Sequence, residues 1–510
     1  MRERDSQTVS IWQQTAFAQD AGSNHLEGTY DVLIVGAGIT GITTALLLQR
    51  AGKRCVIADA KTPGFGTTGG TTAHLNTIFD TTYPDIEKDF GEEAAKLVAS
   101  AGRETINMIK ELVDTFQIDC EFEYKDGLLF SETEAETKEL TKILASSRMA
   151  GVGAVEAQDN DVPIPFQLVV RYPDQAQFHP LKYIDELLSA FVKLGGIVLT
   201  NTLIEDTKYV SGVNVATSEQ GEIRALNLVY ATHIPPGINV FDVRCAPYRS
   251  YVLGVRLRND RYPDSLVYDM QEPYHYFRTV ESPAGGKLLI FGGEDHKTGH
   301  DDPEEAFRTL EAYVRQYYEV EEVAYRWSAQ YYTSGDGLPY IGEMPGGPKG
   351  QYVATGFEGN GMTFGSLAGK ILSDLILERE NKYTNLFSPT RIKPLAGTTE
   401  VIKENIDVAY RFFADRLSVD ELKSVEDLKP GEGKVVKYQG EKMAVYKDET
   451  GNIKALNPTC THAKCIVDFN ASERSWDCPC HGGRFDLEGR VITGPPRVDL
   501  EKIDLPNEGS

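Results

Sequence analysis

The sequence predicts a mixed α/β protein that ends in a small all-β module. Near the N-terminus a short apolar strand runs into a glycine-rich turn and a helix, an order typical of parallel sheets. Residues 248–257 and 287–291 are predicted strands of a second, antiparallel sheet, and only short strands and turns follow about residue 420. Because the chain has 510 residues, we expect roughly three or four folding units.

The composition is that of an acidic, globular protein. Hydrophobic residues make up 41% of the chain and charged residues 25%, which is enough for a packed core. Lys and Arg number 52 against 76 Asp and Glu, so the net charge of −24 disfavours nucleic acid and anionic membrane surfaces as partners. No apolar stretch reaches the ~20 residues of a membrane span, and no signal peptide is evident. We expect a cytoplasmic protein that handles small molecules.

The elements follow from local patterns. Residues 1–27 are a polar leader, expected to drape over the surface, and residues 31–35 and 54–58 are predicted strands around a helix over 42–51. An amphipathic pattern predicts a connecting helix over 400–417. The other predicted elements are helices within 90–150 and over 181–194 and 362–377, and strands at 121–130, 197–203, 226–230 and 351–354.

The first glycine-rich turn carries a nucleotide-binding pattern. Gly36, Gly38 and Gly41 lie between the first strand and its helix, and Asp59 ends the next strand. Glycines allow the backbone to approach a pyrophosphate, which the helix N-terminus stabilises, while the carboxylate accepts hydrogen bonds from the ribose. This unit alone does not distinguish FAD from NAD.

A second glycine-rich segment, residues 356–361, leads directly into the helix over 362–377. Amides at a helix N-terminus suit the negative charge that builds up near the pyrimidine edge of a reduced flavin. The second segment therefore favours FAD.

Four of the seven cysteines crowd near the C-terminus, in Cys460-Thr-His462, Cys465 and Cys478-Pro-Cys480-His481. Such crowding indicates a metal site. Two cysteines and two histidines could bind tetrahedral zinc or an iron–sulfur cluster, and a purely structural group of cysteines is the remaining alternative.

Several motifs resemble the D-amino acid oxidase, glycine oxidase and sarcosine oxidase group over roughly residues 28–380. The resemblance implies a Rossmann-like FAD domain, discontinuous in sequence, with an antiparallel-sheet substrate domain that oxidises a C–N bond by hydride transfer. Relatives with covalent flavin attach it through a cysteine where this chain has Gln330, or through a histidine that His74 does not clearly match, so non-covalent FAD is expected. The motifs are residues 34–59, Gly66 to His74, Phe178-His-Pro180, Asp336 to Gly342 and Ala354 to Thr363. The expected FAD-binding residues are Gly36, Gly38, Ile39, Thr40, Gly41, Asp59, Thr68, Thr72, Gly359, Asn360, Gly361, Met362 and Thr363.

Candidates for the substrate site are fewer. The resemblance implies an arginine that binds a substrate carboxylate, and Arg278, on a predicted strand, is the closest match, although an exposed strand arginine is an equally good interpretation. Tyr276 and Tyr331 are further candidates. The charged stretch Asp295-His-Lys297 is interpreted as a solvated turn.

The C-terminal motif resembles the Rieske [2Fe–2S] domain. The resemblance implies that Cys460 and Cys478 hold one iron and His462 and His481 the other, that Cys465 and Cys480 form a disulfide, and that Gly494-Pro-Pro496 covers the cluster. Gly483 and Phe485 replace the serine and tyrosine of respiratory Rieske proteins, whose hydroxyls donate to the cluster sulfurs. Losing both donors predicts a reduction potential toward the lower part of the Rieske range.

These observations divide the chain into a leader (1–27), an FAD-dependent oxidoreductase (28–392), a linker with a helix (393–419) and a Rieske domain (420–510). The resulting hypothesis is an amine or amino-acid dehydrogenase that passes electrons from FAD through the cluster to an unidentified acceptor. The alternative is an electron-transfer or redox-sensing protein without an amine substrate. A zinc-stabilised module on an ordinary oxidase is a third interpretation.

Overall fold

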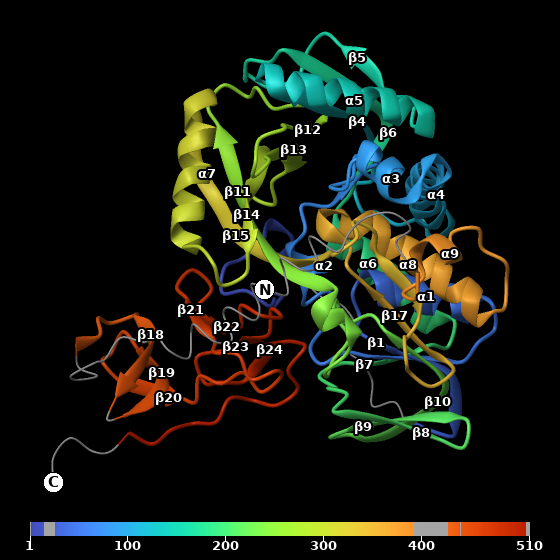
Figure 1. The fold of residues 1–510 in the computed structure, drawn as a ribbon, viewed down its shortest axis with the longest axis vertical. Coiled ribbons are helices and arrows are strands. Elements are labelled where there is room, and N and C mark those ends of the chain that lie inside the picture. The colour runs from blue at the N-terminus through green and yellow to red at the C-terminus, as the bar shows by residue number, and fades with distance from the viewer. Residues whose placement is uncertain (1, 15–25, 392–426, 439, 506–510) are drawn as a thin grey trace.

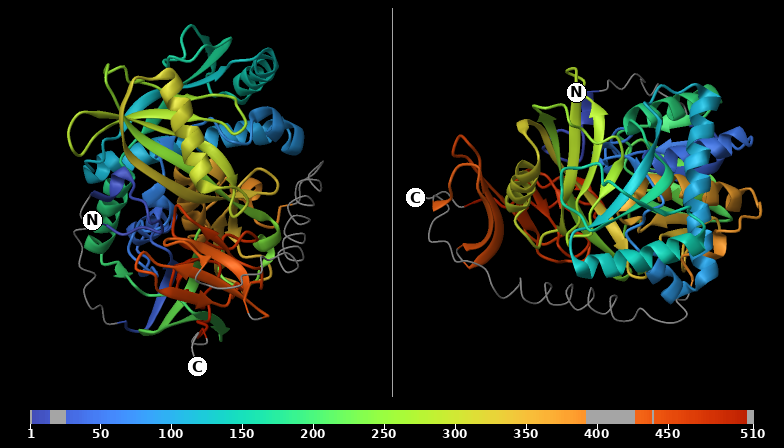
Figure 2. Two further views of the ribbon diagram at one scale, coloured as in Figure 1. Left: turned by 90° about the vertical axis from the view of Figure 1, so that its left-hand side faces the viewer. Right: turned by 90° about the horizontal axis from the view of Figure 1, so that it is seen from above.

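The structure, a computed structural model, describes residues 2–14, 26–391, 427–438 and 440–505. Three parts are visible in Figure 1: a sheet with helices around β1, a second sheet around β11, and a C-terminal module shown in orange and red. Figure 2 shows the same module packed against the other two parts. The predicted linker helix over 400–417 lies outside the described residues.

The first sheet is discontinuous in sequence, as predicted. Its strand order is β16-β17-β10-β1-β2-β7, and β1 pairs in parallel with both β2 and β10. The hairpin of β8 and β9 extends β10, and β16 is antiparallel to β17. The strands are β1 (Thr29–Val35), β2 (Cys55–Ala58), β7 (Ile197–Leu199), β8 (Asp206–Val210), β9 (Val213–Ser218), β10 (Gly221–Tyr230), β16 (Tyr340–Glu343) and β17 (Gln351–Thr355).

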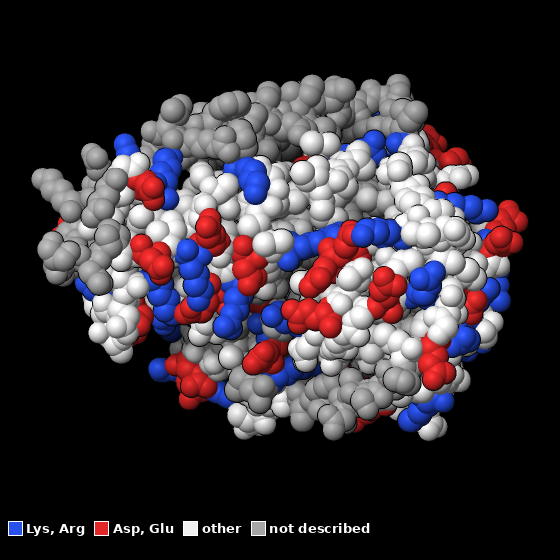
Figure 3. All heavy atoms as spheres, turned by 90° about the horizontal axis from the view of Figure 1, so that it is seen from below, with Lys and Arg blue, Asp and Glu red and all other residues white. Residues whose placement is uncertain are grey.

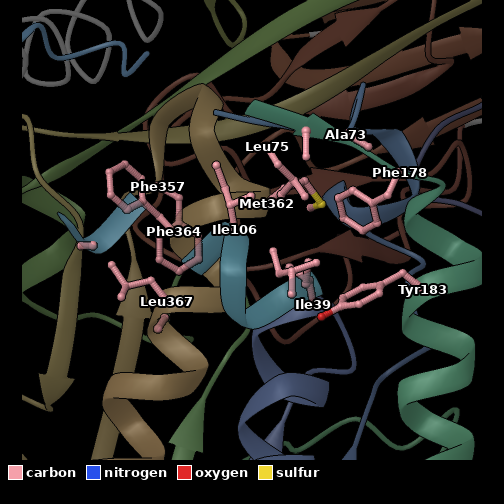
Figure 4. Packing of buried hydrophobic residues seen from close by; sticks show 14 of the residues in the cluster. Ile39, Ala73, Leu75, Ile106, Phe178, Tyr183, Phe357, Met362, Phe364 and Leu367 are labelled. Carbon is pink, nitrogen blue, oxygen red and sulfur yellow. The ribbon is translucent and has the colours of Figure 1, made fainter. Parts of the chain in front are cut away.

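Buried helices cover this sheet and form the main core. Apolar side chains from α1, α4 and α8 meet in Figure 4, among them Ile39, Ile106 and Met362, all at most 4% exposed. Tyr183 of α6 packs edge-to-face on Phe178. The helices are α1 (Ile39–Arg50), α2 (Thr67–Gly70), α3 (Tyr83–Phe90), α4 (Glu92–Phe116), α5 (Glu134–Ala150), α6 (Pro180–Lys193), α7 (Pro303–Tyr317), α8 (Gly361–Ile376) and α9 (Thr384–Phe387), with shorter 3₁₀ turns at Ile11–Gln14, Val240–Val243 and Glu358–Asn360.

The second sheet is the predicted antiparallel one. Its order is β15-β11-β14-β13-β12-β4-β6-β3, and only the β4–β12 pairing is parallel. Helix α7 packs on its β11 and β14 side. The strands are β3 (His74–Leu75), β4 (Glu123–Ser131), β5 (Val155–Ala157), β6 (Leu168–Gln177), β11 (Cys245–Leu257), β12 (Leu266–Tyr268), β13 (Tyr276–Glu281), β14 (Lys287–Lys297) and β15 (Val320–Ser334).

The C-terminal module consists of two small antiparallel sheets, as the short strands predict. Buried cysteines and the aromatic side chains of Trp476 and Phe485 fill the space between its loops. The strands are β18 (Gly433–Tyr438), β19 (Glu441–Lys447), β20 (Ile453–Leu456), β21 (Asp468–Asn470), β22 (Ser475–Asp477), β23 (Arg484–Phe485) and β24 (Val491–Thr493).

The described N-terminal stretch, residues 2–14, is anchored in the core and does not drape over the surface as expected. Ile11 and Trp12 are each 2% exposed and belong to the main core, and Arg4 and Asp5 are also buried. The indole of Trp12 donates a hydrogen bond to the carbonyl of Thr71. Ile11 and Trp12 anchor this otherwise polar segment in the core. The overall polarity of the segment, on which the prediction was based, does not reveal such an anchor.

One face of the molecule shows how charged side chains are distributed on it. On the face in Figure 3, acidic and basic side chains are interspersed, without a broad basic patch. Among the described residues, no helix is both long and apolar enough to cross a membrane.

Candidate functional site

A cavity of about 700 Å³ lies where the three parts of the fold meet. Its walls come from the carboxyl ends of β1 and β2, from strands β11, β13, β14 and β15, and from residues between 490 and 499 of the C-terminal module. The carboxyl edge of a parallel sheet is where such folds bind nucleotides.

One end of the cavity has the geometry of a nucleotide site. Gly36 has a positive φ of 107°, and a Cβ there would lie 2.4 Å from the carbonyl oxygen of Ala231, so only glycine fits this turn. The carboxylate of Asp59 accepts hydrogen bonds from the amides of Ala37 (2.6 Å) and Lys61 (2.8 Å), which hold it at the cavity wall. Burial raises the pKa of Asp59 above its ordinary value.

Most of the expected FAD-binding residues line this cavity, and two do not. Gly41 packs against the carbonyl oxygen of Gly36 inside the turn, and the hydroxyl of Thr363 points to the carbonyl of Asn76. An open cavity, a glycine turn at a helix N-terminus and an oriented carboxylate together fit FAD. The expected residues that line the cavity are Gly36, Gly38, Ile39, Thr40, Asp59, Thr68, Thr72, Gly359, Asn360, Gly361 and Met362.

The other end of the cavity is acidic and aromatic. Asp80 accepts a hydrogen bond from the amide of Gly359 (2.7 Å), at the start of the segment that leads into α8. Asp295 accepts one from the hydroxyl of Tyr331 (2.9 Å), and Tyr276 shares a hydrogen bond with Ser250 (2.8 Å). Burial raises the pKa of Asp295 to about 7, and the enclosed position of Asp80 raises its pKa as well.

The structure places Arg278 outside the cavity, unlike the expectation that it binds the substrate. It is 3% exposed and does not line the cavity. Its Nη1 donates to the carbonyl oxygens of Thr72 (2.5 Å), Ala73 (2.9 Å) and Phe178 (3.4 Å). These carbonyls engage Nη1 of the guanidinium, so Arg278 clamps the loop before β3 from a position outside the cavity lining.

Two acids of the substrate end, Asp80 and Asp295, were not among the residues predicted from the sequence. The stretch from Asp295 to Lys297, interpreted as a solvated turn, is the last part of β14, because residues 296 and 297 pair with β11. Asp80 lies in a loop without a recognisable motif. A signal for Asp295 existed in the sequence, since the apolar strand pattern continues through the glycines that precede it.

The predicted metal ligands come together in the C-terminal module. The rings of His462 and His481 lie 5.0 Å apart, and both Nδ1 atoms are buried without a hydrogen-bond partner among the described residues. The thiols of Cys460 and Cys478 contact each other, and this contact lowers the pKa of Cys460 to about 7. Two free imidazole nitrogens and two adjacent thiols fit a [2Fe–2S] cluster with mixed ligands.

A disulfide, a proline loop and a buried aromatic ring pack closely around this metal site. Cys465 and Cys480 form the predicted disulfide. A Cβ on Gly483 would lie 2.7 Å from Cδ of Pro496, so the covering proline loop leaves no room for a larger residue at 483. Phe485 is fully buried beside the cysteines and offers no hydroxyl to the cluster.

The metal site and the cavity are neighbours. The hydroxyl of Tyr332, which lines the cavity, donates to the carbonyl oxygen of His481 (2.9 Å). Gln330 lines the same wall and donates to the carbonyl oxygen of Gly482 (2.9 Å). Nε2 of His462 lies 3.5 Å from the carboxylate of Asp242, so the flavin side of the molecule covers this imidazole.

A buried network of charges fixes the C-terminal module in this position. Arg249 of β11 lies 3.7 Å from Glu473 and 3.8 Å from Asp477, and Arg484 donates to Asp477 (3.1 Å). Burial alone would raise the pKa of Glu473 and of Asp477, but the arginines more than offset it, so both lie below their ordinary values. The six charged residues of the network are Arg4, Asp5, Arg249, Glu473, Asp477 and Arg484.

Comparison with known proteins agrees with this geometry. The family model described as FAD dependent oxidoreductase matches residues 31–375, and the model of the Rieske [2Fe-2S] domain matches residues 419–504. FAD and a [2Fe–2S] cluster are the cofactors that these two domains imply.

Individual relatives cover the chain to different extents. The iron-sulfur protein YhfW of Bacillus subtilis (strain 168), named for a Rieske 2Fe-2S centre, is 35% identical over 93% of both chains. The gamma-glutamylputrescine oxidoreductase of Escherichia coli (strain K12) is 24% identical over 77% of this chain and 94% of its own length. Glycine oxidase from Geobacillus kaustophilus has a similar fold, with a TM-score of 0.60 at 21% identity, over 72% of this chain and 100% of its own. The chain therefore belongs to the FAD-dependent oxidoreductase family and carries a Rieske [2Fe–2S] domain at its C-terminal end.

Proposed function

We propose that this protein is a dehydrogenase that oxidises a C–N bond of an amine or amino acid and delivers the electrons to an acceptor through its Rieske cluster. The observation that carries the proposal is the shared cavity wall. Tyr332 borders the flavin cavity and at the same time binds the backbone of His481 in the metal site. When bound, FAD accepts a hydride from the carbon of a C–N bond, and a [2Fe–2S] cluster carries electrons one at a time.

The residues of the cavity have separable tasks. The turn from Gly36 to Ile39 and the carboxylate of Asp59 would hold the nucleotide part of FAD, and the segment from Gly359 to Met362, which lines the same cavity, would bind the flavin part. Tyr276, Tyr331 and Asp295 surround the space that remains for the substrate. By enclosing it, they exclude water and orient the bond to be oxidised.

The four ligands of the cluster are Cys460, His462, Cys478 and His481 in this proposal. Their thiols and free Nδ1 atoms support the assignment, and the disulfide between Cys465 and Cys480 joins the two ligand loops. Asp242 covers the Nε2 edge of the buried His462 ring. A cluster that faces the flavin side in this way favours electron entry from the flavin over entry from a quinol.

Anaerobic reduction tests the proposal. The purified protein, with both cofactors, is mixed under argon with a panel of primary amines, secondary amines and amino acids, while flavin absorbance and the EPR signal of the cluster are recorded. The proposal predicts that at least one compound bleaches the flavin and produces the rhombic signal of a reduced Rieske cluster. If no compound bleaches the flavin but a chemical reductant of the cluster does, the protein is an electron-transfer or redox-sensing protein instead.

A further inference from the structure

We propose that the substrate is an amine cation that carries no carboxylate beside its nitrogen. This inference rests on the proposed function and specifies its substrate class. Its basis is the chemical character of the substrate end of the cavity, where acids and tyrosines are present and basic side chains are not.

Two of the carboxylates that line the cavity lie beside its tyrosines. Asp80 borders it beside Gly359, and Asp295 borders it beside Tyr331. Oδ1 of Asp295 is buried and has no hydrogen-bond partner among the described residues. A buried acceptor without a partner is unfavourable unless a ligand supplies the donor, and an ammonium group carries up to three N–H donors.

Tyrosines form the remaining walls. Tyr274 and Tyr276 lie with ring centroids 5.9 Å apart, and Tyr331 packs on Tyr248 at 6.0 Å. Tyr274, Tyr276 and Tyr331 all line the cavity. Aromatic faces attract cations within about 6 Å of the ring centroid, so carboxylates surrounded by tyrosines form a receptor for a positive group.

A receptor for a substrate carboxylate is missing from the same region. The lysine and arginines that line the cavity, among the described residues, are Lys61, Arg490 and Arg497. Lys61 follows Asp59 at the nucleotide end, and Arg497 donates to the carbonyls of Glu205 and Pro236. An α-carboxylate placed between Asp80 and Asp295 would meet like charges with no cation to balance them.

The histidine at this end does not supply the positive charge either. Burial, and then the nearby Arg278, hold the pKa of His74 well below its ordinary value, so its imidazole is neutral. Its Nδ1 shares a hydrogen bond with the hydroxyl of Tyr268 (2.7 Å). Arg278 itself is occupied by backbone carbonyls.

The experiment compares matched pairs that differ by one carboxylate: 1,4-diaminobutane with ornithine, and butylamine with norvaline. For each compound, the anaerobic rate of flavin bleaching and the perturbation of the flavin spectrum are measured against concentration. We expect each amine to have an apparent dissociation constant at least about 10-fold lower than its carboxylated partner. The Asp295→Asn variant should bind the amines about 10- to 100-fold more weakly, the range for one charge-assisted hydrogen bond.

Matched controls separate binding from folding. Glu281→Gln changes an exposed acid at the end of β13 and should leave both constants unchanged. Thermal unfolding of Asp295→Asn shows whether this variant folds, and 1,4-diaminobutane should raise the melting temperature of the wild type more than that of the variant.

The outcomes distinguish this inference from the proposed function. If ornithine and norvaline bind as well as their amines or better, the inference is wrong while C–N oxidation stands. If the amines bind selectively but never bleach the flavin, the inference stands and the proposed function is wrong. If neither class perturbs or bleaches the flavin, both are wrong.

Discussion

Buried acids occur in two regions of this molecule with opposite surroundings. At the domain interface, Glu473 and Asp477 lie among arginines, and their pKa values are held below the ordinary range. In the substrate end of the cavity, Asp80 and Asp295 have tyrosines as neighbours, and burial raises their pKa values. Since both regions are enclosed, the difference lies in the partners and not in the depth of burial.

The acids of the interface hold two parts of the protein together, whereas the acids of the cavity are available to bind a ligand. The interface contains its own counter-charges, with three arginines facing three acids, so its charges balance within the protein. The cavity contains carboxylates without counter-charges, and a cationic ligand would complete it. A buried acid without a basic partner in a cavity is therefore a candidate for ligand recognition.

The largest effect is expected from removing one acid of the interface. Glu473→Gln leaves three buried arginines with two acids, and breaking such a network costs about 3–5 kcal/mol of unfolding free energy. Denaturation followed by the visible circular dichroism of the cluster reports on the Rieske domain. Glu488→Gln, which weakens two exposed pairs, with Lys454 and with Lys502, is the control and should cost at most about 1 kcal/mol for each pair. Equal losses for the two variants would contradict the interface as described.

The next effect is a pH dependence of amine binding. Asp295 has a pKa of about 7, so amine binding should strengthen up to about 10-fold as pH rises from about 6 to 8 and the carboxylate loses its proton. The amine itself stays charged, because its own pKa lies near 10. The tyrosines that line the same cavity keep neutral hydroxyls over this range. The other acids of its lining include Asp80, Glu272 and Glu358, so the Asp295 variant is needed to assign the titration. Asp295→Asn should flatten the profile, and an unchanged profile would assign the titration elsewhere.

The two regions should also differ in how pH affects stability. The folded protein holds the proton of Asp295 to a higher pH than the unfolded chain does, so this residue lowers the unfolding free energy as pH rises from about 4 to 7. Glu473 and Asp477 act in the opposite sense: their stabilisation is complete above the unfolded pKa of about 4 and is lost as pH falls through the lower, folded pKa. Chemical denaturation of wild type and Asp295→Asn at several pH values measures the difference.

A smaller effect is expected at Tyr332, where cavity and metal site meet. Tyr332→Phe removes the hydrogen bond to the carbonyl of His481 and should cost about 1 kcal/mol of unfolding free energy. Flavin bleaching should keep its rate, whereas the later reduction of the cluster should slow several-fold. Stopped-flow absorbance resolves the two phases. Equal slowing of both would place Tyr332 in substrate binding instead.

The smallest effect concerns the cluster alone. Phe485→Tyr places a hydroxyl beside the cysteines, and a hydrogen bond of about 1 kcal/mol to the reduced cluster corresponds to a rise of about 40 mV in its one-electron potential. An EPR-monitored redox titration measures it. Gly483→Ser is unsuitable for the same purpose because Pro496 occupies the space. An unchanged potential would contradict the prediction that the missing hydroxyl at residue 485 lowers the potential of the cluster.

The parts of the fold that local patterns specify were predictable. The glycine turn before α1, the segment before α8 and the cysteine and histidine pairs each lie within a few dozen residues, so local spacing pointed to them and the family resemblances assigned their roles. Contacts between residues that lie far apart in the sequence were not predictable in this way. Arg249 meets Glu473 across more than 200 residues, and Arg278 is held by the carbonyls of a loop far from it in sequence. No local pattern records which distant group neutralises a charge.

The most direct test of the central claim is the molecularity of electron transfer from flavin to cluster. Amine and protein are mixed anaerobically at several protein concentrations, and rapid-freeze EPR follows the Rieske signal while absorbance follows the flavin. Because the interface holds both sites in one molecule, the account predicts that the signal appears after bleaching with a rate independent of protein concentration. A rate proportional to protein concentration, or a bleached flavin without a cluster signal, would contradict it.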